Sequence, residues 1–548
     1  MSLRTVIWLV LIGSSILILI EYLYRKNKAG KMQKEAIRAR WGKPPKVTDY
    51  DKEESLKKAY HLGKSTHNFD SQIDDITWHD LDMSTVFLSI NTTYSSLGAE
   101  ALYRRFRCYS FEQDKDLSDL IEFFDCNPEV RERTIDAFAK LGKQNDNGTQ
   151  AYLAGEYTPV MKSLSFYLVF ATIPLVGFFL SFIFATMGNI ILITGMAINA
   201  LYYYLNEQKY YSELEKVRYL IQIVLCAKKL TQEPLPMQKK IKNLVLPFES
   251  ILSTGIAFGN NWHDEISRGS VKFAMLFMMP FISAHVVYNK MGHQRGDLLT
   301  LWELLGNLEI ACCILNLRTF QSKTAIPTFD TVEVHGNKMY HPLLKQPVEN
   351  DVNWEQITLV TGSNASGKST YVKSVAINCI LAQTIQTVFA ESFSMRPGHV
   401  LTSMAVSDNL FEGNSYFVAE IKSIKRLLNR VATGERCYCF VDEILKGTNT
   451  VERISASSSL IEWLDGYSSL AFIATHDIEL PIILEGICHN IHFSEKILDE
   501  GITFDYKLQH DPATSRNAIA LLEVMNYPEE IIVSAQKKAH HFDSNQHW

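Results

Sequence analysis

The sequence lacks the patterns that mark several common protein classes. Its nine cysteines form no Cys-x-x-Cys pair and show no Cys/His spacing suited to zinc, so the usual structural zinc sites are excluded. The net charge of −6 excludes a chain that is basic throughout, and any nucleic-acid contact must therefore come from a local patch. The sequence contains no internal repeat and no low-complexity segment. We interpret the cysteines as buried thiols in a reducing compartment.

Charged residues are also missing from two long apolar stretches. Thr5 to Ile20 is uncharged, and we interpret residues 1–24 as an uncleaved transmembrane anchor. A cleaved signal peptide fits less well, because only Arg4 provides a basic start and no small-x-small cleavage site follows. The basic residues beyond it place the N-terminus outside and the rest of the chain in the cytoplasm. They are Arg25, Lys26, Lys28, Lys31, Lys34, Arg38 and Arg40.

The second apolar stretch, Ser163 to Asn206, contains no Asp, Glu, Lys or Arg. As a helix it would measure about 66 Å, roughly twice the hydrocarbon core of a bilayer, so it predicts two spans that turn near Gly188. A buried soluble hairpin is the alternative, although such helices normally keep one polar face. We interpret Phe273 to Tyr288 as a buried soluble helix, because a fourth span would place the remaining chain outside the cell. The prediction is a multi-pass membrane protein with three spans.

Residues 357–371 contain a phosphate-binding pattern. An apolar, β-branched run ends at Thr361, Gly362-x-x-x-x-Gly367-Lys368-Ser369 follows, and then a helical segment begins. The glycines let backbone N–H groups surround phosphate oxygens, Lys368 adds a positive charge, and Ser369 offers a hydroxyl to Mg²⁺. The predicted nucleotide-binding residues in this loop are Gly362, Ser363, Asn364, Ala365, Ser366, Gly367, Lys368, Ser369 and Thr370.

Two later strands carry the other predicted catalytic residues. The run from Tyr438 ends in Asp442 and Glu443, which suits a Mg²⁺ ligand followed by a base that polarises the attacking water. A third strand, Leu470 to Ala474, leads to His476, which we predict to contact the γ-phosphate. ATP and Mg²⁺ are thus the predicted cofactors. A single histidine can equally be structural.

These motifs together resemble the ATPase region of MutS-type DNA mismatch repair proteins over about residues 336–500. The resemblance rests on Thr361–Tyr371 and on these further segments: His341-Pro342-Leu343, Asn350-Asp351-Val352, Ser407-Asp408-Asn409-Leu410, Gly413–Phe417, Glu420-Ile421, Asp442–Thr450, Ala474–Asp477 and Glu479-Leu480. It implies an ATPase that works as a homodimer, in which Ser415 reaches the γ-phosphate bound by the partner subunit. Ser415 could also be a plain helix cap. The resemblance further implies that ATP-driven closure is coupled to clamping on duplex or branched DNA.

The sequence departs from that family in its first half. No Phe-x-Glu occurs in the first 160 residues, so we expect a variant without the mismatch-reading domain. The apolar hairpin lies inside the helical core, where relatives carry their DNA clamp, and we suggest that it replaces or displaces this clamp. The leading hypothesis is a membrane-anchored MutS-type ATPase that acts on DNA. A membrane scaffold or sensor that uses the ATPase dimer as a switch is the alternative, and a transporter of the ABC type fits least.

The predicted fold class is an α/β P-loop NTPase domain at the C-terminus, preceded by an all-α core and transmembrane helices. Helical periodicity dominates from about Asp74 to Lys323, and short apolar strands alternate with helices from about Val332 to His492. The predicted parts are the anchor 1–24, a basic linker 25–73, a helical core 74–335 with the hairpin 163–206, and the ATPase domain 336–548. The linker would lie beside lipid headgroups or, as an alternative, bind DNA. The ATPase domain ends in a helix–turn–helix dimerisation tail.

Overall fold

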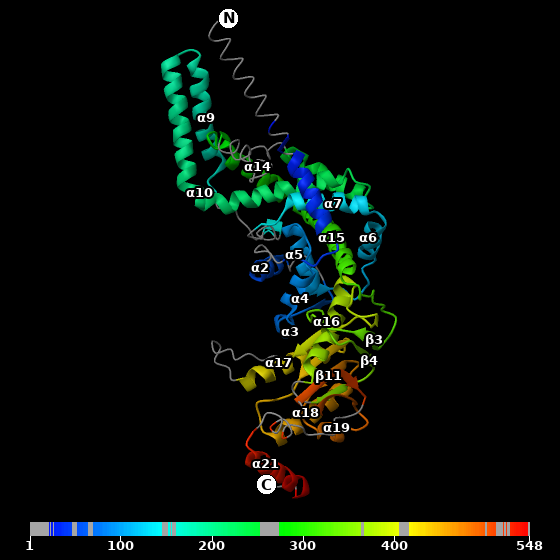
Figure 1. Cartoon of the computed structure of the whole chain (residues 1–548). Helices are drawn as coiled ribbons and strands as arrows, with labels where there is room; N and C mark the ends of the chain where they lie inside the picture. Colours follow the sequence, from blue (N-terminus) through cyan, green and yellow to red (C-terminus); the bar gives the residue numbers. More distant parts are fainter. Residues whose placement is uncertain are drawn as a thin grey trace. The chain divides into compact units, whose positions relative to one another are not determined.

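A computed structural model describes the chain in two compact units, each built from separate stretches of sequence. The first unit comprises Met1–Asn68, Asn91–Tyr103 and Lys115–Phe320, and the second comprises Phe69–Ile90, Arg104–Asp114 and Gln321–Trp548. Figure 1 shows helices through the first half of the chain and strands gathered in the second half. The description covers all residues except 1–20, 22–23, 26, 47–51, 64–68, 145–151, 154, 156–160, 253–272, 363–365, 405–415, 499–500, 511–518, 520–521, 523–526 and 546–548.

Regular structure in the described part of the first unit is helical. Amphipathic spacing explains these helices: in α6, for example, Leu117, Leu120, Ile121 and Phe124 are buried at intervals of three or four residues. The unit also contains the first part of α5 (Ser96–Arg107). Its other helices are α2 (Glu53–Gly63), α6 (Lys115–Cys126), α7 (Pro128–Leu141), α9 (Leu164–Ser181), α10 (Ala185–Leu230), α11 (Gln238–Val245), η2 (Leu246–Phe248), α12 (Glu249–Leu252), α14 (Met279–His293) and α15 (Arg295–Phe320).

The predicted apolar hairpin consists of α9 and the first half of α10. Their backbones approach very closely: a Cβ at Gly177 would lie 2.3 Å from the nitrogen of Leu192, and one at Gly188 would lie 2.1 Å from that of Ser181. Small residues at such contacts are typical of helix pairs in membranes. Both Leu164–Ser181 and Ala185–Asn206 are long and apolar enough to cross a bilayer, and only 22% and 17% of these windows is buried. Their apolar side chains therefore face outward, toward whatever solvent surrounds the hairpin.

Helix α14 packs against this hairpin. We predicted a buried helix from Phe273 to Tyr288; residues 276–278 form a turn, and the long helix begins at Met279. The Phe281 ring stacks on Tyr167 of α9 with centroids 4.7 Å apart. The side-chain amide of Asn199, which is fully buried on α10, donates to the carbonyls of Phe170 and Leu276 at 3.1 and 2.7 Å. These contacts pair the amide nitrogen of a polar side chain inside an otherwise apolar hairpin.

A third described helix, α15, also has the length and composition of a membrane span. However, 72% of its apolar window is buried inside the protein, so we interpret it as the central helix of the first unit. Leu301, Leu305 and Leu308 on it are fully buried. The predicted N-terminal span, residues 5–20, lies outside the described residues.

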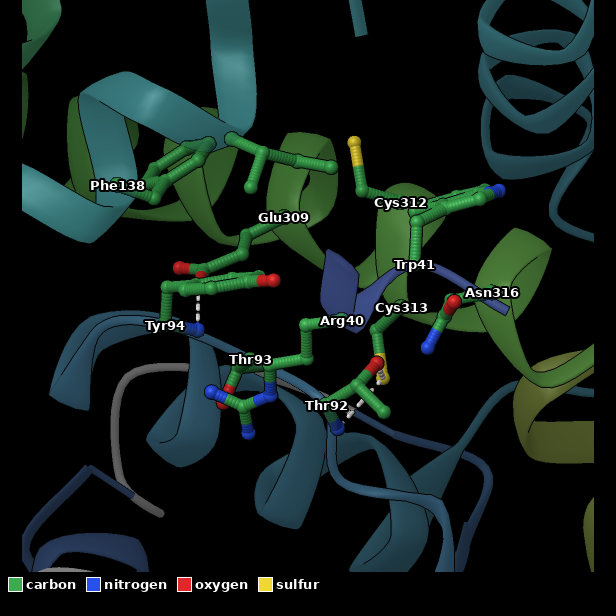
Figure 2. A pocket seen from close by; sticks show the side chains of 11 residues that line it. Arg40, Trp41, Thr92, Thr93, Tyr94, Phe138, Glu309, Cys312, Cys313 and Asn316 are labelled. Carbon is green, nitrogen blue, oxygen red and sulfur yellow. Dashed lines mark hydrogen bonds between the residues drawn. The ribbon is translucent and has the colours of Figure 1, made fainter. Parts of the chain in front are cut away.

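The predicted basic linker contains ordered parts. Residues 27–40 are helical, and Ile37 there and Tyr60 in α2 are each 4% exposed. Figure 2 shows a small pocket in which Arg40 and Trp41 lie beside α15. The Arg40 guanidinium lies 4.9 Å from the ring of Tyr94, and the backbone nitrogen of Gly42 donates to Asn316 Oδ1 at 2.7 Å. The end of the 27–40 helix is therefore held against the helical core.

The second unit is built around a six-stranded sheet in the order β11-β10-β5-β9-β8-β7. The five strands from β10 to β7 are parallel, and β11 is antiparallel to β10. The strands are β5 (Thr358–Gly362), β7 (His399–Ser403), β8 (Cys437–Asp442), β9 (Leu470–Ala474), β10 (His489–Leu498) and β11 (Gly501–Gln509). The predicted mostly parallel sheet is thereby observed, and β8 and β9 lie where the sequence placed them.

Alternate residues of these strands point to opposite faces of the sheet, and other elements cover each face. Cys439 and Val441 of β8 join a core with Leu427 of α17 (Tyr416–Val431) and Ile461 of α18 (Thr450–Asp465). On the opposite face, Phe440 lies against Trp354, with ring centroids 5.2 Å apart. The Tyr371 ring of α16 (Lys368–Ile385) meets Phe472 of β9 on that same face. Burial on both faces explains the continuous apolar runs of these strands.

Smaller elements complete the second unit. A three-stranded sheet has the order β4-β3-β6, and a two-stranded one pairs β1 with β2. Within the predicted tail, α21 is described as a helix, whereas most of the preceding segment lies outside the described residues. The remaining elements are β1 (Ser71–Gln72), α3 (Asp75–Asp80), α4 (Met83–Ile90), β2 (Cys108–Tyr109), β3 (Val334–Met339), β4 (Asn350–Trp354), β6 (Ser392–Ser394), α19 (Leu480–Ile483) and α21 (Glu529–Asn545).

Candidate functional site

The connection between β5 and α16 is shaped by two glycines. Gly362 ends β5 with a φ of +133°, and Gly367 precedes α16 with a φ of +103°. Both conformations favour glycine, because a Cβ would be strained there. An added Cβ would also come too close to neighbouring atoms. On Gly362 it would lie 2.4 Å from the carbonyl oxygen of Phe493, and on Gly367 it would lie 3.1 Å from the ring of Tyr506. One end of the loop is thus held by close approach of the β10 backbone, and the other lies against the Tyr506 ring.

Two polar side chains project from the first turn of α16. Lys368 is 3% exposed, and its Nζ donates to the carbonyl of Gly362 at 2.6 Å. The Ser369 hydroxyl donates to Asp442 Oδ2, at the end of β8, over 2.8 Å. A helix N-terminus, an amine and a hydroxyl–carboxylate pair therefore meet at one edge of the sheet. This combination can bind a phosphate group together with a divalent cation.

Glu443 lies directly after β8, in the strained left-handed region with a φ of +60°. Its backbone nitrogen donates to the carbonyl of Ala474 in β9 at 2.9 Å. The carboxylate lies 3.1 Å from His476 Nε2 and 3.4 Å from Lys446 Nζ. The hydrogen bond with His476, followed by the charge of Lys446, holds the pKa of Glu443 below its ordinary value although burial opposes this. An ionised carboxylate fixed in this way can accept a proton.

His476 connects Glu443 to Lys368. Its Nε2 atom lies 3.3 Å from Lys368 Nζ as well as 3.1 Å from the Glu443 carboxylate. The loop that carries His476 is fixed from both sides. Thr475 donates its backbone N–H to the carbonyl of Val360 at 3.0 Å, and Asp477 forms a two-pronged pair with Arg453 at 3.0 and 2.5 Å. Lys368, Glu443 and His476 therefore form one contact cluster across β5, β8 and β9.

Comparison with known proteins decides the family of this region. Residues 358–543 match the family model of MutS domain V. This chain carries a MutS domain V. The DNA mismatch repair protein MutS of Streptococcus sanguinis (strain SK36) is 31% identical over 192 residues, which cover 34% of this chain and 22% of that relative. The resemblance noted in the sequence is thereby confirmed, and the match extends over about a fifth of the relative's length.

The MutS domain V brings most of the predicted site residues together. Gly362, Lys368, Ser369, Asp442, Glu443 and His476 are linked by the contacts above. Ser366, which is buried, and Gly367 and Thr370 lie beside them in the same loop and first helical turn. Four predicted residues, Ser363, Asn364, Ala365 and Ser415, lie outside the described residues.

The structure adds two residues that we had not assigned to the site. Lys446 contacts the Glu443 carboxylate, and Tyr506 packs over Gly367 from β11. The carbonyl of Tyr506 accepts a hydrogen bond from the side chain of Asn350 at 2.9 Å, which fixes its strand. Lys446 lies three residues after Glu443 in the acidic-strand motif, and this spacing could have indicated it. No local pattern indicates Tyr506, because its contact depends on how β11 folds back.

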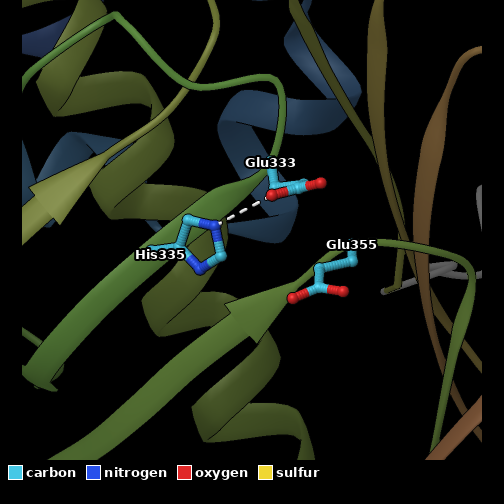
Figure 3. A group of neighbouring side chains, drawn as sticks. All are labelled: Glu333, His335 and Glu355. Atoms are coloured by element: carbon cyan, nitrogen blue, oxygen red, sulfur yellow. Dashed lines mark hydrogen bonds and ion pairs between the residues drawn. The ribbon is translucent and has the colours of Figure 1, made fainter.

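A separate cluster of Glu333, His335 and Glu355 lies at the start of β3 and the end of β4 (Figure 3). The three ligand atoms lie within 4.8 Å of one another, which is a spacing that metal sites also show. Each acid already has a partner: Glu333 pairs with His335 at 3.1 Å, and Asn353 donates to Glu355 at 3.1 Å. The side chains of Glu333 and His335 are 46% and 37% exposed. We therefore interpret this cluster as hydrogen-bonded surface side chains, and assign it no chemistry.

Proposed function

We propose that this chain is a membrane-anchored MutS-family ATPase that couples ATP binding and hydrolysis to dimer closure and DNA binding. The observation that carries the proposal is the meeting of Lys368, Ser369–Asp442 and Glu443–His476 at one edge of the parallel sheet. These are the groups that phosphoryl transfer to water requires: a phosphate cradle, oxygen ligands for a cation, and a base. They lie within the region that matches MutS domain V.

Each group has a role that its contacts suit. The backbone between Gly362 and Gly367 and the N-terminus of α16 would hold the β- and γ-phosphates, with Lys368 as the positive charge. Ser369 and Asp442 would hold Mg²⁺, since both offer oxygen ligands and already lie 2.8 Å apart. When bound, Mg²⁺ supplies charge that stabilises the transferred phosphoryl group. Glu443 would take a proton from the attacking water, while His476 and Lys446 keep its carboxylate ionised and in place.

The proposed working unit is a homodimer. The family resemblance implies that Ser415, which precedes α17, reaches the γ-phosphate bound by the partner subunit. Mixed dimers test this proposal: one subunit carries Ser415→Ala and the other Lys368→Ala, which inactivates its own pocket. If Ser415 acts across the interface, the mixed dimer keeps hydrolysis at the remaining pocket, because the Lys368→Ala subunit supplies an intact Ser415 to it. An effect confined to the pocket of the Ser415→Ala subunit would contradict it.

The membrane part of the proposal rests on the hairpin of α9 and α10. Both of its candidate spans expose apolar side chains along their length, including Phe178, Phe179 and Ile193 at 46%, 67% and 64%. With the proposed anchor at residues 1–24, three spans place the second unit in the cytoplasm, where ATP is available. Protease treatment of sealed vesicles tests this orientation. Protection of the second unit in inside-out vesicles would overturn it.

Lys368→Ala and Glu443→Gln separate binding from chemistry. We expect Lys368→Ala to weaken Mg-ATP binding at least about tenfold, because it removes the buried amine at the phosphate site. Glu443→Gln should bind Mg-ATP normally and turn over about a hundredfold or more slowly, because an amide cannot accept the proton. Lys338→Ala is a matched control, since Lys338 is exposed and paired with Glu391 on the three-stranded sheet. Wild-type affinity in Lys368→Ala would remove the nucleotide from this pocket.

The DNA-binding part of the proposal competes with a second candidate function. The family match covers residues 358–543, and the apolar hairpin of α9 and α10 lies outside it, in the first unit. This favours, as the second candidate, a membrane scaffold or sensor in which the ATPase dimer is a switch without DNA. The deciding experiment measures binding of the full chain in detergent to duplex, mismatched and branched DNA, with and without ATP, across several salt concentrations. ATP-dependent binding with a steep salt slope supports the first candidate. Nucleotide-dependent dimerisation without DNA binding supports the second.

A further inference from the structure

Strand β7 is an edge strand, and side chains pair with backbone groups at its carboxyl end. Among the described strands it pairs with β8 alone, and α3 lies along its other side. The N–H of Thr402 donates to Thr77 Oγ1 at 3.3 Å, and the N–H of Met404 donates to Asp80 Oδ2 at 2.9 Å. The hydroxyl of Thr402 donates to the same carboxylate oxygen at 2.7 Å. Thr77, Asp80 and Thr402 are at most 1% exposed, so α3 seals the edge of the ATPase sheet.

Arg426 of α17 ties this edge to the start of α3. One guanidinium nitrogen contacts Asp74 Oδ2, and the other donates to the carbonyl of Thr402. Asp74 also begins α3, because its other carboxylate oxygen accepts the backbone N–H of Thr77 at 2.8 Å. The side chains of Arg426 and Asp74 are 24% and 35% exposed. A single arginine therefore joins α17, β7 and α3 through charge-assisted hydrogen bonds.

The first turns of α17 contact the loop that carries Glu443. Glu420 is 3% exposed, and its carboxylate accepts the backbone N–H of Lys446 at 3.0 Å. The neighbouring Gly447 lies against Phe417, whose side chain would be 3.2 Å from an added Cβ. The side chain of Lys446 in turn lies 3.4 Å from the Glu443 carboxylate. The catalytic loop is thus bound to α17 about two turns before Arg426.

We propose that Arg426 is a positioning residue that makes α3 follow the movement of α17 when nucleotide binds. The proposal rests on the ATPase function proposed above. Helix α17 contacts the loop that carries Glu443 through Glu420 and Phe417, so a shift of that loop on nucleotide binding acts on the helix near its N-terminus. A helix moves largely as a rigid body, and Arg426 anchors it to Asp74 and to the end of β7. From α3 the chain continues through α4 and enters the first unit at Asn91. Helix α3, from which the chain leads into the first unit, is therefore joined to α17.

Two conservative variants separate this role from a merely structural one. Asp74→Asn keeps an oxygen that can accept the Thr77 N–H and removes the charge that faces Arg426. Arg426→Gln keeps a donor for the Thr402 carbonyl and removes the charge. Glu391→Gln is the control, since it makes the same chemical change in an exposed ion pair with Lys338 that lies outside α3, β7 and α17. All are made in the full chain and studied in detergent.

The experiment measures backbone hydrogen exchange of residues 74–90 with and without Mg²⁺ and the ATP analogue adenylyl imidodiphosphate. The affinity of each variant for this analogue is measured as well. In wild type and in Glu391→Gln we expect the analogue to slow exchange there by about tenfold or more. Asp74→Asn and Arg426→Gln should bind the analogue within about threefold of wild type and lose most of that slowing. The double variant should lose no more than either single one, because both remove the same contact.

Three outcomes would overturn the proposal. Asp74→Asn and Arg426→Gln could keep the full slowing of hydrogen exchange. They could also lose affinity for the analogue by as large a factor as they lose slowing, which would indicate general damage to the fold. Wild type could also bind the analogue without any change in residues 74–90. A wild-type protein that binds no analogue at all is a different result: it removes the nucleotide pocket itself, and with it the proposed ATPase.

Discussion

Replacing Gly362 by alanine tests whether the approach of β5 and β10 shapes the phosphate loop. The residue has a φ of +133°, and its Cβ would lie 2.4 Å from the carbonyl oxygen of Phe493. That distance is far inside van der Waals contact, and the obstacle is backbone in a parallel strand pair, so β10 must move. The loop between Gly362 and Gly367 would then lose the geometry that the nucleotide requires.

The expected cost has two parts. The left-handed backbone strain costs about 1–2 kcal/mol, and the clash with backbone adds about 1–3 kcal/mol. Alanine also reduces the freedom of the unfolded chain, which offsets roughly 0.4–1 kcal/mol. The net loss of unfolding free energy is therefore about 1–5 kcal/mol. For a unit of this size, this corresponds to a fall in melting temperature of roughly 2–20 °C.

Gly434→Ala is the matched control. Gly434 has a φ of +78°, and its Cβ would meet nothing within 4 Å, so that variant has the backbone strain without the clash. Thermal unfolding in detergent and the affinity for Mg-ATP are measured for both variants. Gly362→Ala should melt lower than Gly434→Ala and lose nucleotide affinity, which Gly434→Ala should retain. Equal melting temperatures with retained affinity would refute the reasoning.

Three further predictions concern other parts of the chain. Ser369→Ala and Asp442→Asn should each raise the Mg²⁺ concentration for half-maximal ATP hydrolysis by about tenfold or more, and an unchanged midpoint would contradict the assignment. Burial, and then Lys373, lower the pKa of His341 to about 4, and its Nδ1 accepts the N–H of Leu343 at 3.3 Å. The unfolded chain therefore takes up this proton first as pH falls, so up to about 3 kcal/mol of stability is lost between pH 6.5 and about 4. His341→Asn, which keeps an acceptor, should flatten that part of the stability curve in denaturant titrations; parallel curves would show that His341 is not responsible. Gly177→Leu should separate α9 from α10 and lower the melting temperature in detergent, whereas Val176→Leu, at an exposed site, should not; equal effects would speak against the close packing.

Much of the candidate site could be predicted because its parts are local in sequence. The run from Ile357 to Tyr371 contains strand, loop and helix within fifteen consecutive positions, so its pattern reveals the phosphate-binding geometry directly. The same holds for the strand that ends at Asp442 and Glu443. The contact of His476 with both Glu443 and Lys368 needed the order β5-β9-β8, which local patterns do not contain.

Composition alone was least informative for the long apolar helices. Arg295–Phe320 satisfies the same length and hydropathy criteria as the hairpin helices, yet 72% of its window is buried. Apolar side chains are equally suited to a protein core and to lipid, so only the packing around a helix separates the two. The hairpin could be predicted because its charge-free stretch is twice as long as a soluble core helix needs.

The sequence by itself determined the family of the carboxyl-terminal region, the phosphate loop and the acidic strand, since each depends on residues that are neighbours along the chain. Tertiary structure alone decided that Phe69–Ile90 and Arg104–Asp114 belong to the second unit. It also decided that Arg426 joins Asp74, a residue more than three hundred positions away. Contacts of this kind depend on how distant segments pack, and neither periodicity nor residue spacing encodes them.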